Sequence, residues 1–169
     1  LYILNFRNFE VRKALYSVVV PALTMKSNSE VVSAQSFLRK MMQDGNTAEA
    51  KKALKALIAD VPYSNKKMAS MDMEERYRLI MSTIFRALGF RVEVERMLAT
   101  GRIDMIVEVP SIIYVLELKL SNNGGISAAE NQMKEKSYTE PFKADKRKVI
   151  ALAVELDETG KGLIDWKEV

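Results

Sequence analysis

The chain has 169 residues, a formal net charge of +4 and 48% hydrophobic residues, and it contains neither cysteine nor histidine. The lack of cysteine excludes disulfides and thiolate metal sites and fits a reducing, cytoplasmic compartment. The lack of histidine excludes Ser-His-Asp chemistry and histidine-ligated zinc, so catalysis would depend on carboxylates, lysine, arginine, tyrosine, hydroxyls or a metal held by oxygens. The sequence has no GxxxxGK[ST] loop and no apolar run of about 18 residues, so we expect neither a P-loop ATPase nor a membrane span.

The N-terminal third predicts a small helical appendage. Residues 1–6 read as a strand, and helices are expected to begin at Ser29 and Thr47, whose side chains can cap a helix. Since the first residue is Leu1 rather than methionine, we expect an upstream part of the protein. The helices are predicted over residues 9–23, 29–42 and 47–60. We therefore interpret residues 1–62 as an appendage or linker, and residues 63–169 as the main domain.

The remaining chain predicts the order α-β-β-β-α-β after a polar loop at 63–70. The expected elements are a helix at 72–88 stopped by Gly89, strands at 90–96, 103–109 and 112–120, a helix at 127–138 after the flexible break 121–125, a strand at 149–156, and a short last strand at 162–166. Three antiparallel strands joined by a crossover helix to a fourth strand make an α/β layer architecture.

One predicted hairpin carries the chemistry. A two-residue turn at Pro110 and Ser111 sets a register in which Asp104 faces Glu117, with their Cβ atoms about 5 Å apart. Lys119 lies two residues after Glu117 and projects from the same face of its strand. Two acids and one lysine therefore converge on one side of an otherwise hydrophobic hairpin.

This arrangement predicts a divalent metal site. Facing carboxylates repel each other, and magnesium accepts one or two carboxylates together with waters and phosphate oxygens. Lys119 could then orient or deprotonate an attacking water, or stabilise a pentavalent phosphate. The alternative is a hairpin whose acids and lysine form a solvated row of ion pairs.

Two helices add candidate residues. Glu74 shares the inward side of its helix with Tyr77 and is a candidate for the site; alternatively it is an exposed acid that complements the helix dipole. Gln132 and Lys136 lie one turn apart on the second helix. The basic turn 143–148 could follow a nucleic-acid strand, or it is a solvated charge cluster.

The order of these motifs resembles the PD-(D/E)XK nuclease superfamily. Ile103-Asp104 and Glu117-Leu118-Lys119 correspond to its signature, with isoleucine in the place of the proline. The chain is more closely similar to the nuclease-like domain found C-terminal to AAA-ATPase-like domains in many bacteria. The stretches that carry this similarity are LGF (88–90), GRID (101–104), YVLELKL (114–120), YTEPF (138–142), KVI (148–150) and DW (165–166).

The resemblance implies a restriction-endonuclease-like αβββαβ core with a central mixed sheet. It also implies a metal-dependent phosphodiesterase that uses Mg²⁺ or Mn²⁺. The implied metal ligands are Asp104, Glu117, the helix acid Glu74 and the backbone carbonyl of Leu118. The implied catalytic residues are Asp104, Glu117, Lys119 and Gln132, and the implied nucleic-acid contacts are Lys136 and Tyr138.

The expected activity is hydrolysis of a nucleic acid, with DNA as the expected substrate and no membrane involved. An ATPase-like domain upstream in the same protein is the second expected partner. Two alternatives stay open: a non-catalytic module that binds nucleic acid or regulates the ATPase, and a phosphodiesterase acting on RNA or a small nucleotide. An enzyme is expected to lose metal binding and cleavage when Glu117 is replaced by alanine, whereas a non-catalytic module is expected to lose little of its binding.

Overall fold

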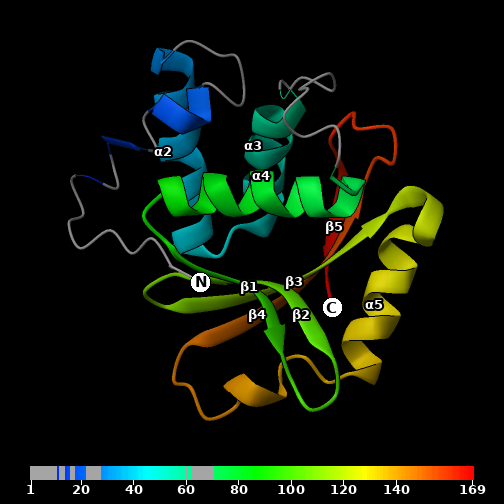
Figure 1. Ribbon diagram of the computed structural model, residues 1–169. Helices are drawn as coiled ribbons and strands as arrows, with labels where there is room; N and C mark the ends of the chain where they lie inside the picture. Colours follow the sequence, from blue (N-terminus) through cyan, green and yellow to red (C-terminus); the bar gives the residue numbers. More distant parts are fainter. Residues whose placement is uncertain (1–10, 12–13, 16–17, 22–27, 60, 62–70) are drawn as a thin grey trace.

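The computed structural model describes residues 11, 14–15, 18–21, 28–59, 61 and 71–169. A five-stranded sheet runs through the molecule, with helix α4 across one face and helix α5 against the other (Figure 1). Helices α2 and α3 lie on the α4 side. In the described part of the chain, no helix is long and apolar enough to cross a membrane.

The sheet has the strand order β1-β2-β3-β4-β5. Strands β3 and β4 are parallel and the other neighbours are antiparallel, because only β3 and β4 are connected by a crossover helix. The predicted mixed α/β sheet is therefore confirmed, and the short last strand is present as β5. The strands are β1 Arg91–Met97, β2 Arg102–Glu108, β3 Ile112–Leu120, β4 Lys148–Leu156 and β5 Leu163–Glu168.

Helix α4, Met73–Ala87, begins and ends as the sequence predicts. The side chain of Asp72 accepts a hydrogen bond from the backbone N–H of Glu74 at the first turn. Gly89 has a φ of 84°, a left-handed conformation that glycine adopts without steric penalty, and its N–H donates to the carbonyl of Arg86. These two caps give α4 a defined length across the sheet.

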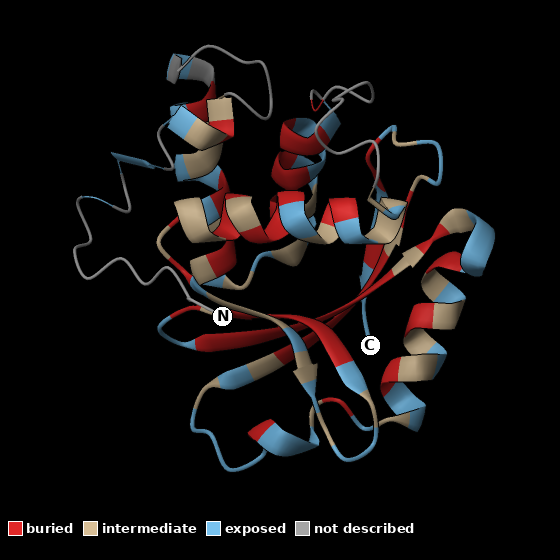
Figure 2. Cartoon of the chain, in the orientation of Figure 1, coloured by how far each residue is buried: buried red, intermediate tan, exposed pale blue. Residues whose placement is uncertain are grey.

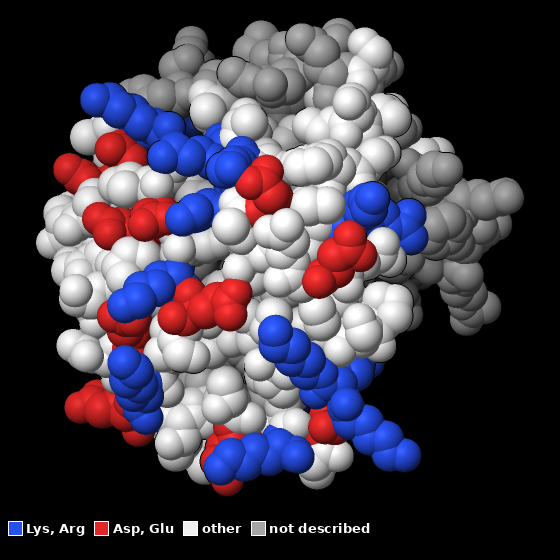
Figure 3. Space-filling view, turned by 180° about the vertical axis from the view of Figure 1, so that it is seen from behind, with Lys and Arg blue, Asp and Glu red and all other residues white. Residues whose placement is uncertain are grey.

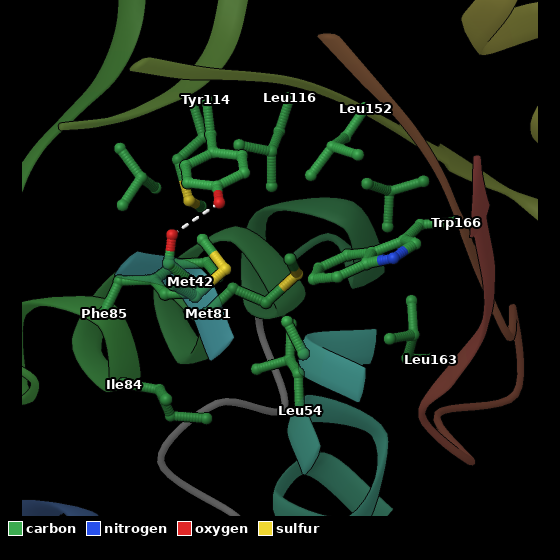
Figure 4. Close-up of a cluster of buried hydrophobic side chains, with 14 of the residues drawn as sticks. Met42, Leu54, Met81, Ile84, Phe85, Tyr114, Leu116, Leu152, Leu163 and Trp166 are labelled. Carbon is green, nitrogen blue, oxygen red and sulfur yellow. Dashed lines mark hydrogen bonds between the residues drawn. The ribbon is translucent and has the colours of Figure 1, made fainter. Parts of the chain in front are cut away.

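Helices α2, Asn28–Asp44, and α3, Thr47–Ala59, contribute to the same apolar core as the sheet. Met42 and Leu54 pack in the cluster that contains Trp166, and the hydroxyl of Tyr114 donates to the carbonyl of Met42 over 2.5 Å (Figure 4). Buried residues concentrate in the central strands and on the sheet-facing sides of the helices (Figure 2). The boundary at residues 62 and 63 stays a prediction.

The opposite face of the sheet carries a smaller core. Helix α5, Gly125–Glu135, packs Ala129 and Met133 against Val115 on β3 and Ala153 on β4. Tyr138, which follows the helix, is buried in the same cluster. The two alanines let α5 approach the sheet closely, and Tyr138 lies beyond its C-terminal end on the side of the predicted site.

Several predicted boundaries differ from the structure. Asn46, rather than Thr47, caps α3, because its Oδ1 accepts the N–H of Glu49 while the hydroxyl of Thr47 donates to Glu168. Ser29 lies one residue inside α2.

The segment between β3 and α5 also differs from the prediction. Residues Ser121–Asn123 form a 3₁₀ helix instead of a flexible break, and α5 starts at Gly125 and ends at Glu135. In this way the short connection continues directly from the strand into the helix.

Some N-terminal predictions fall outside the described residues. These are the strand at 1–6, the loop at 63–70 and most of the helix at 9–23. Within that last range, the described residues 11, 14–15 and 18–21 are helical.

Candidate active site

Asp104 and Glu117 lie where strands β2 and β3 separate. The predicted register is confirmed from Glu108, which pairs with Ile113, to Met105, which pairs with Leu116. Asp104 and Glu117 are the next residues in that register, but the Cα pairing has ended. The carboxylate of Asp104 accepts the backbone N–H of Leu118 instead, with 2.9 Å between Oδ2 and N. Where β2 and β3 separate, a hydrogen bond to the Asp104 side chain thus takes the place of a hydrogen bond between the two backbones.

The two acids are buried. Glu117 is 0% exposed and Asp104 is 3% exposed. The Nζ atom of Lys119 is 2.8 Å from Glu117 Oε1, as expected for neighbours on one face of a strand. Glu117 Oε2 has no hydrogen-bond partner. The alternative of a solvated row of ion pairs is therefore wrong.

Burial decides the charge of Glu117. Burial and the nearby carboxylate of Asp104 raise the pKa of Glu117 to about 8, and the bond to Lys119 offsets only part of this increase. Burial by itself lowers the pKa of Lys119, but the acids around it, Glu117 first, raise it overall. The pKa values of Glu117 and Lys119 are therefore both raised in the metal-free protein. A bound cation would lower both of them, because it favours the deprotonated forms.

Glu74 lies within electrostatic reach of this pair. Partial burial raises its pKa most, the charge of Asp104 raises it further, and the charge of Lys119 lowers it. Glu75 is exposed, so the preference for Glu74 as the inward acid is consistent with the structure. A role for Glu74 as a metal ligand stays a prediction.

The donor set fits a hard cation that keeps part of its hydration. Within the described residues, no three acidic side chains lie close enough together to enclose a metal ion. Asp104 and Glu117 supply two carboxylates, and the predicted third protein ligand is the backbone carbonyl of Leu118. Magnesium is usually held in this way, with waters and substrate phosphates completing its coordination. The unpartnered Glu117 Oε2 is the atom that such an ion would satisfy.

The C-terminal end of α5 reaches this site. Gln132 Nε2 donates to the hydroxyl of Tyr138 over 3.0 Å. Burial raises the pKa of Tyr138, and Glu117 and Asp104 are near enough to raise it further. Because Tyr138 is only 1% exposed, neither its ring nor its hydroxyl lies at the surface, and the burial argues against the predicted contact between Tyr138 and a nucleic acid.

The β1–β2 loop packs against the same region. Thr100 Oγ1 donates to the carbonyl of Lys136 over 2.7 Å. A Cβ atom on Gly101 would lie 3.3 Å from the hydroxyl of Tyr138 and 3.4 Å from the side chain of Lys136. The absence of a side chain at Gly101 therefore permits the close packing of this loop on α5.

The sequence analysis missed Arg78 and Glu95. Arg78 Nη1 is 3.6 Å from Asp104 Oδ1, and Arg78 Nη2 is 3.3 Å from Glu95 Oε1. The available signal was the spacing, since Arg78 follows Glu74 by four residues and so lies on the same side of α4.

The basic turn 143–148 is largely compensated by neighbouring acids. Arg147 makes ion pairs with Asp145 at 2.7 Å and Glu108 at 2.9 Å, and Lys143 pairs with Glu140 at 2.6 Å. Positive and negative side chains are also interspersed on the face in Figure 3. These pairs favour the interpretation as a solvated charge cluster.

Comparison with known families supports the assignment from the hairpin. A family model of the PD-(D/E)XK nuclease superfamily matches residues 72–166, more than half of the chain and the whole of the predicted site. The chain belongs to the PD-(D/E)XK nuclease superfamily. The resemblance inferred from Asp104 and the Glu117-Leu118-Lys119 motif is thus confirmed. Nucleases of this superfamily typically use divalent metals and bind nucleic acids.

One curated relative covers nearly the entire chain. It is described as "Uncharacterized protein in vnfD 5'region" from Azotobacter chroococcum mcd 1 and is 24% identical over 174 residues. The match includes 98% of this chain but 32% of the relative, so the chain spans about a third of the length of the relative. No solved structure matches the chain.

Proposed function

We propose that this PD-(D/E)XK domain hydrolyses phosphodiester bonds of DNA with the help of Mg²⁺ or Mn²⁺. The observation that carries the proposal is Glu117 Oε2, a fully buried carboxylate oxygen without a hydrogen-bond partner. The Glu117 side chain lies beside Asp104, and its other oxygen, Oε1, makes an ion pair with Lys119. Burying an acid in this state is unfavourable unless a ligand compensates it.

The metal would be held by Asp104, Glu117 and the carbonyl of Leu118, with Glu74 as a further ligand. When bound, it would supply a Lewis acid that polarises the phosphate and lowers the pKa of a bound water. The N–H of Leu118 fixes Asp104 Oδ2, so Oδ1, which lies 3.6 Å from Arg78 Nη1, is the oxygen that would bind the metal.

The surrounding residues orient the reactants. Lys119 is 19% exposed at its side chain, so its ammonium group can hold Glu117 and still reach a water or a phosphate oxygen at the opening. Gln132, which is fixed by Tyr138, and Lys136 would contact the phosphate backbone. Backbone contacts of this kind do not depend on base sequence.

The test is a comparison of Glu117→Ala with Glu135→Ala, which removes an exposed acid from the end of α5. Calorimetry with Mg²⁺ and Mn²⁺ is combined with incubation of plasmid DNA, single-stranded DNA and RNA, with EDTA as the metal-free control. We expect the native chain and Glu135→Ala to bind metal and cleave DNA, and Glu117→Ala to lose both, with cleavage reduced by about a hundredfold or more.

Other outcomes decide between the remaining functions. Metal binding without cleavage of DNA or RNA would contradict the nuclease proposal and favour a non-catalytic, nucleic-acid-binding or regulatory module. Cleavage of RNA alone would contradict the choice of DNA. Cleavage that Glu117→Ala retains would show that the site is elsewhere.

We also propose that residues 1–62 link this domain to an ATPase-like region in a longer protein of the cytoplasm. The support is the greater length of the curated relative. Because α2 and α3 share the core of the sheet, this linker would transmit movement directly to the nuclease domain.

A further inference from the structure

Arg78 is a second cation beside the predicted metal ligands. It lies on α4 one helical turn after Glu74, and its side chain is 12% exposed. Its guanidinium lies 3.3 Å from Glu95 on β1 and 3.6 Å from Asp104 on β2. Arg78 therefore joins α4 to two strands at the place where β2 separates from β3.

The contact between Arg78 and Asp104 is an ion pair without a hydrogen bond. Arg78 Nη1 is buried and lacks a hydrogen-bond partner, although Asp104 Oδ1 is the carboxylate oxygen in front of it. The other oxygen, Oδ2, is engaged by the N–H of Leu118. Separating Arg78 from Asp104 would break no hydrogen bond, so a divalent cation, with its higher charge, can take the place of the guanidinium at Oδ1.

Glu95 does not depend on Arg78 alone. It also makes an ion pair with Arg102, with 2.8 Å between Nη1 and Oε1. Its φ of 56° is a left-handed conformation that is uncommon for a residue with a side chain, and such conformations cluster at functional sites. Removal of Arg78 would therefore leave Glu95 with Arg102 but would take away the ion-pair partner of Asp104. The charge of Arg78 also acts on Glu74, so its removal affects the candidate metal ligands together.

We infer that Arg78 is a positioning residue that acts as the resident counter-cation of Asp104 and competes with the divalent metal for Asp104 Oδ1. The inference rests on the function proposed above. A guanidinium stays charged at all accessible pH values, so Arg78 neutralises Asp104 in the metal-free protein and repels an incoming cation. Arg78 thus stabilises the empty site and weakens metal binding.

The test uses four versions of the full chain: native, Arg78→Met, Arg78→Lys and Arg102→Met. Arg102 is the matched control, because it binds Glu95 but makes no ion pair with Asp104. Two quantities are measured, the urea midpoint of unfolding in EDTA and the Kd for Mn²⁺ by calorimetry. Neither measurement needs nuclease activity.

We expect Arg78→Met to lower the urea midpoint in EDTA and at the same time to bind Mn²⁺ about fivefold more tightly or better, since a like charge near the metal is removed. Arg78→Lys keeps the charge and should restore the native Kd. Arg102→Met should keep the Kd within about twofold, because its charge is exposed and screened. A purely structural role for Arg78 would weaken both stability and metal binding.

An unchanged or larger Kd in Arg78→Met would overturn the inference and leave the nuclease proposal intact. Absence of Mn²⁺ binding in the native chain would overturn the proposed function, and with it the competition. If Arg78→Met does not fold, Arg78→Gln removes the charge but keeps a polar side chain, and it must show the same tighter binding.

Discussion

The two ends of the β2–β3 hairpin are built from the same strands but differ in chemistry. At the turn end, Ile106 and Val107 pair with Val115 and Tyr114, and all four are 0–1% exposed. At the open end, the pairing has stopped and two carboxylates, Asp104 and Glu117, are buried among apolar neighbours. Apolar packing at one end of the hairpin therefore holds in place a group of charges that would be unfavourable on its own.

The largest expected change in stability comes from a substitution in the apolar part of the hairpin. Leu116 is 0% exposed and forms the last Cα pair before the site, opposite Met105. Leu116→Ala should lower the free energy of unfolding by about 2–5 kcal/mol, because it removes buried surface and leaves a cavity. Urea unfolding checks this, and a loss below about 1 kcal/mol would show that the hairpin core can collapse around the gap.

The next effect comes from the open end, where replacing the buried acid Glu117 should stabilise the metal-free protein instead of destabilising it. The pKa of Glu117 is raised from 4.5 to about 8, so the folded protein binds a proton that the unfolded chain releases above pH 4.5. The stabilising contribution of this proton is complete below pH 4.5 and is lost as the pH rises through about 8. The metal-free native chain should therefore become less stable between these values.

Glu117→Gln should remove this pH dependence and stabilise the metal-free chain by about 1–3 kcal/mol at pH 8, since a neutral side chain replaces a buried charge. Urea unfolding in EDTA at several pH values measures both quantities. Equal pH profiles for the native chain and Glu117→Gln would contradict the assignment of the titration to this residue.

The smallest expected effect comes from an exposed ion pair at the surface of the hairpin. Arg91 is 77% exposed at its side chain and lies 3.5 Å from Glu108, which also pairs with Arg147. Arg91→Ala should change stability by less than about 0.5 kcal/mol, because an exposed ion pair is screened by water. A clearly larger loss in the urea midpoint would show that exposed charges contribute to the hairpin as the buried ones do.

Local patterns in the sequence correctly predicted the hairpin and the convergence of its two acids and its lysine. The turn at Pro110 and Ser111 sets the register because a two-residue connection leaves little choice of pairing, and side chains alternate along each strand. From this it follows that Asp104 and Glu117 come together, and the short contact between Lys119 and Glu117 confirms the shared face. The order of the strands follows equally from local periodicity and short connections.

The cap of α3 shows where local reasoning stops. Asn46 and Thr47 are both good caps by residue type. The hydroxyl of Thr47 donates to Glu168 instead of capping the helix, because β5 brings Glu168 within reach. A contact between residues so far apart in the chain decides which of two equivalent signals is used.

The order of the elements, the register of the hairpin and the identity of the acids and lysine follow from the sequence, because they depend on short-range periodicity and turn chemistry. Tertiary structure alone decided that Glu117 is fully buried with one unpartnered oxygen, and that Arg78 faces Asp104. Burial and long-range charge contacts depend on how α4, α5 and the sheet pack together, and that packing sets the pKa values on which the proposed metal binding depends.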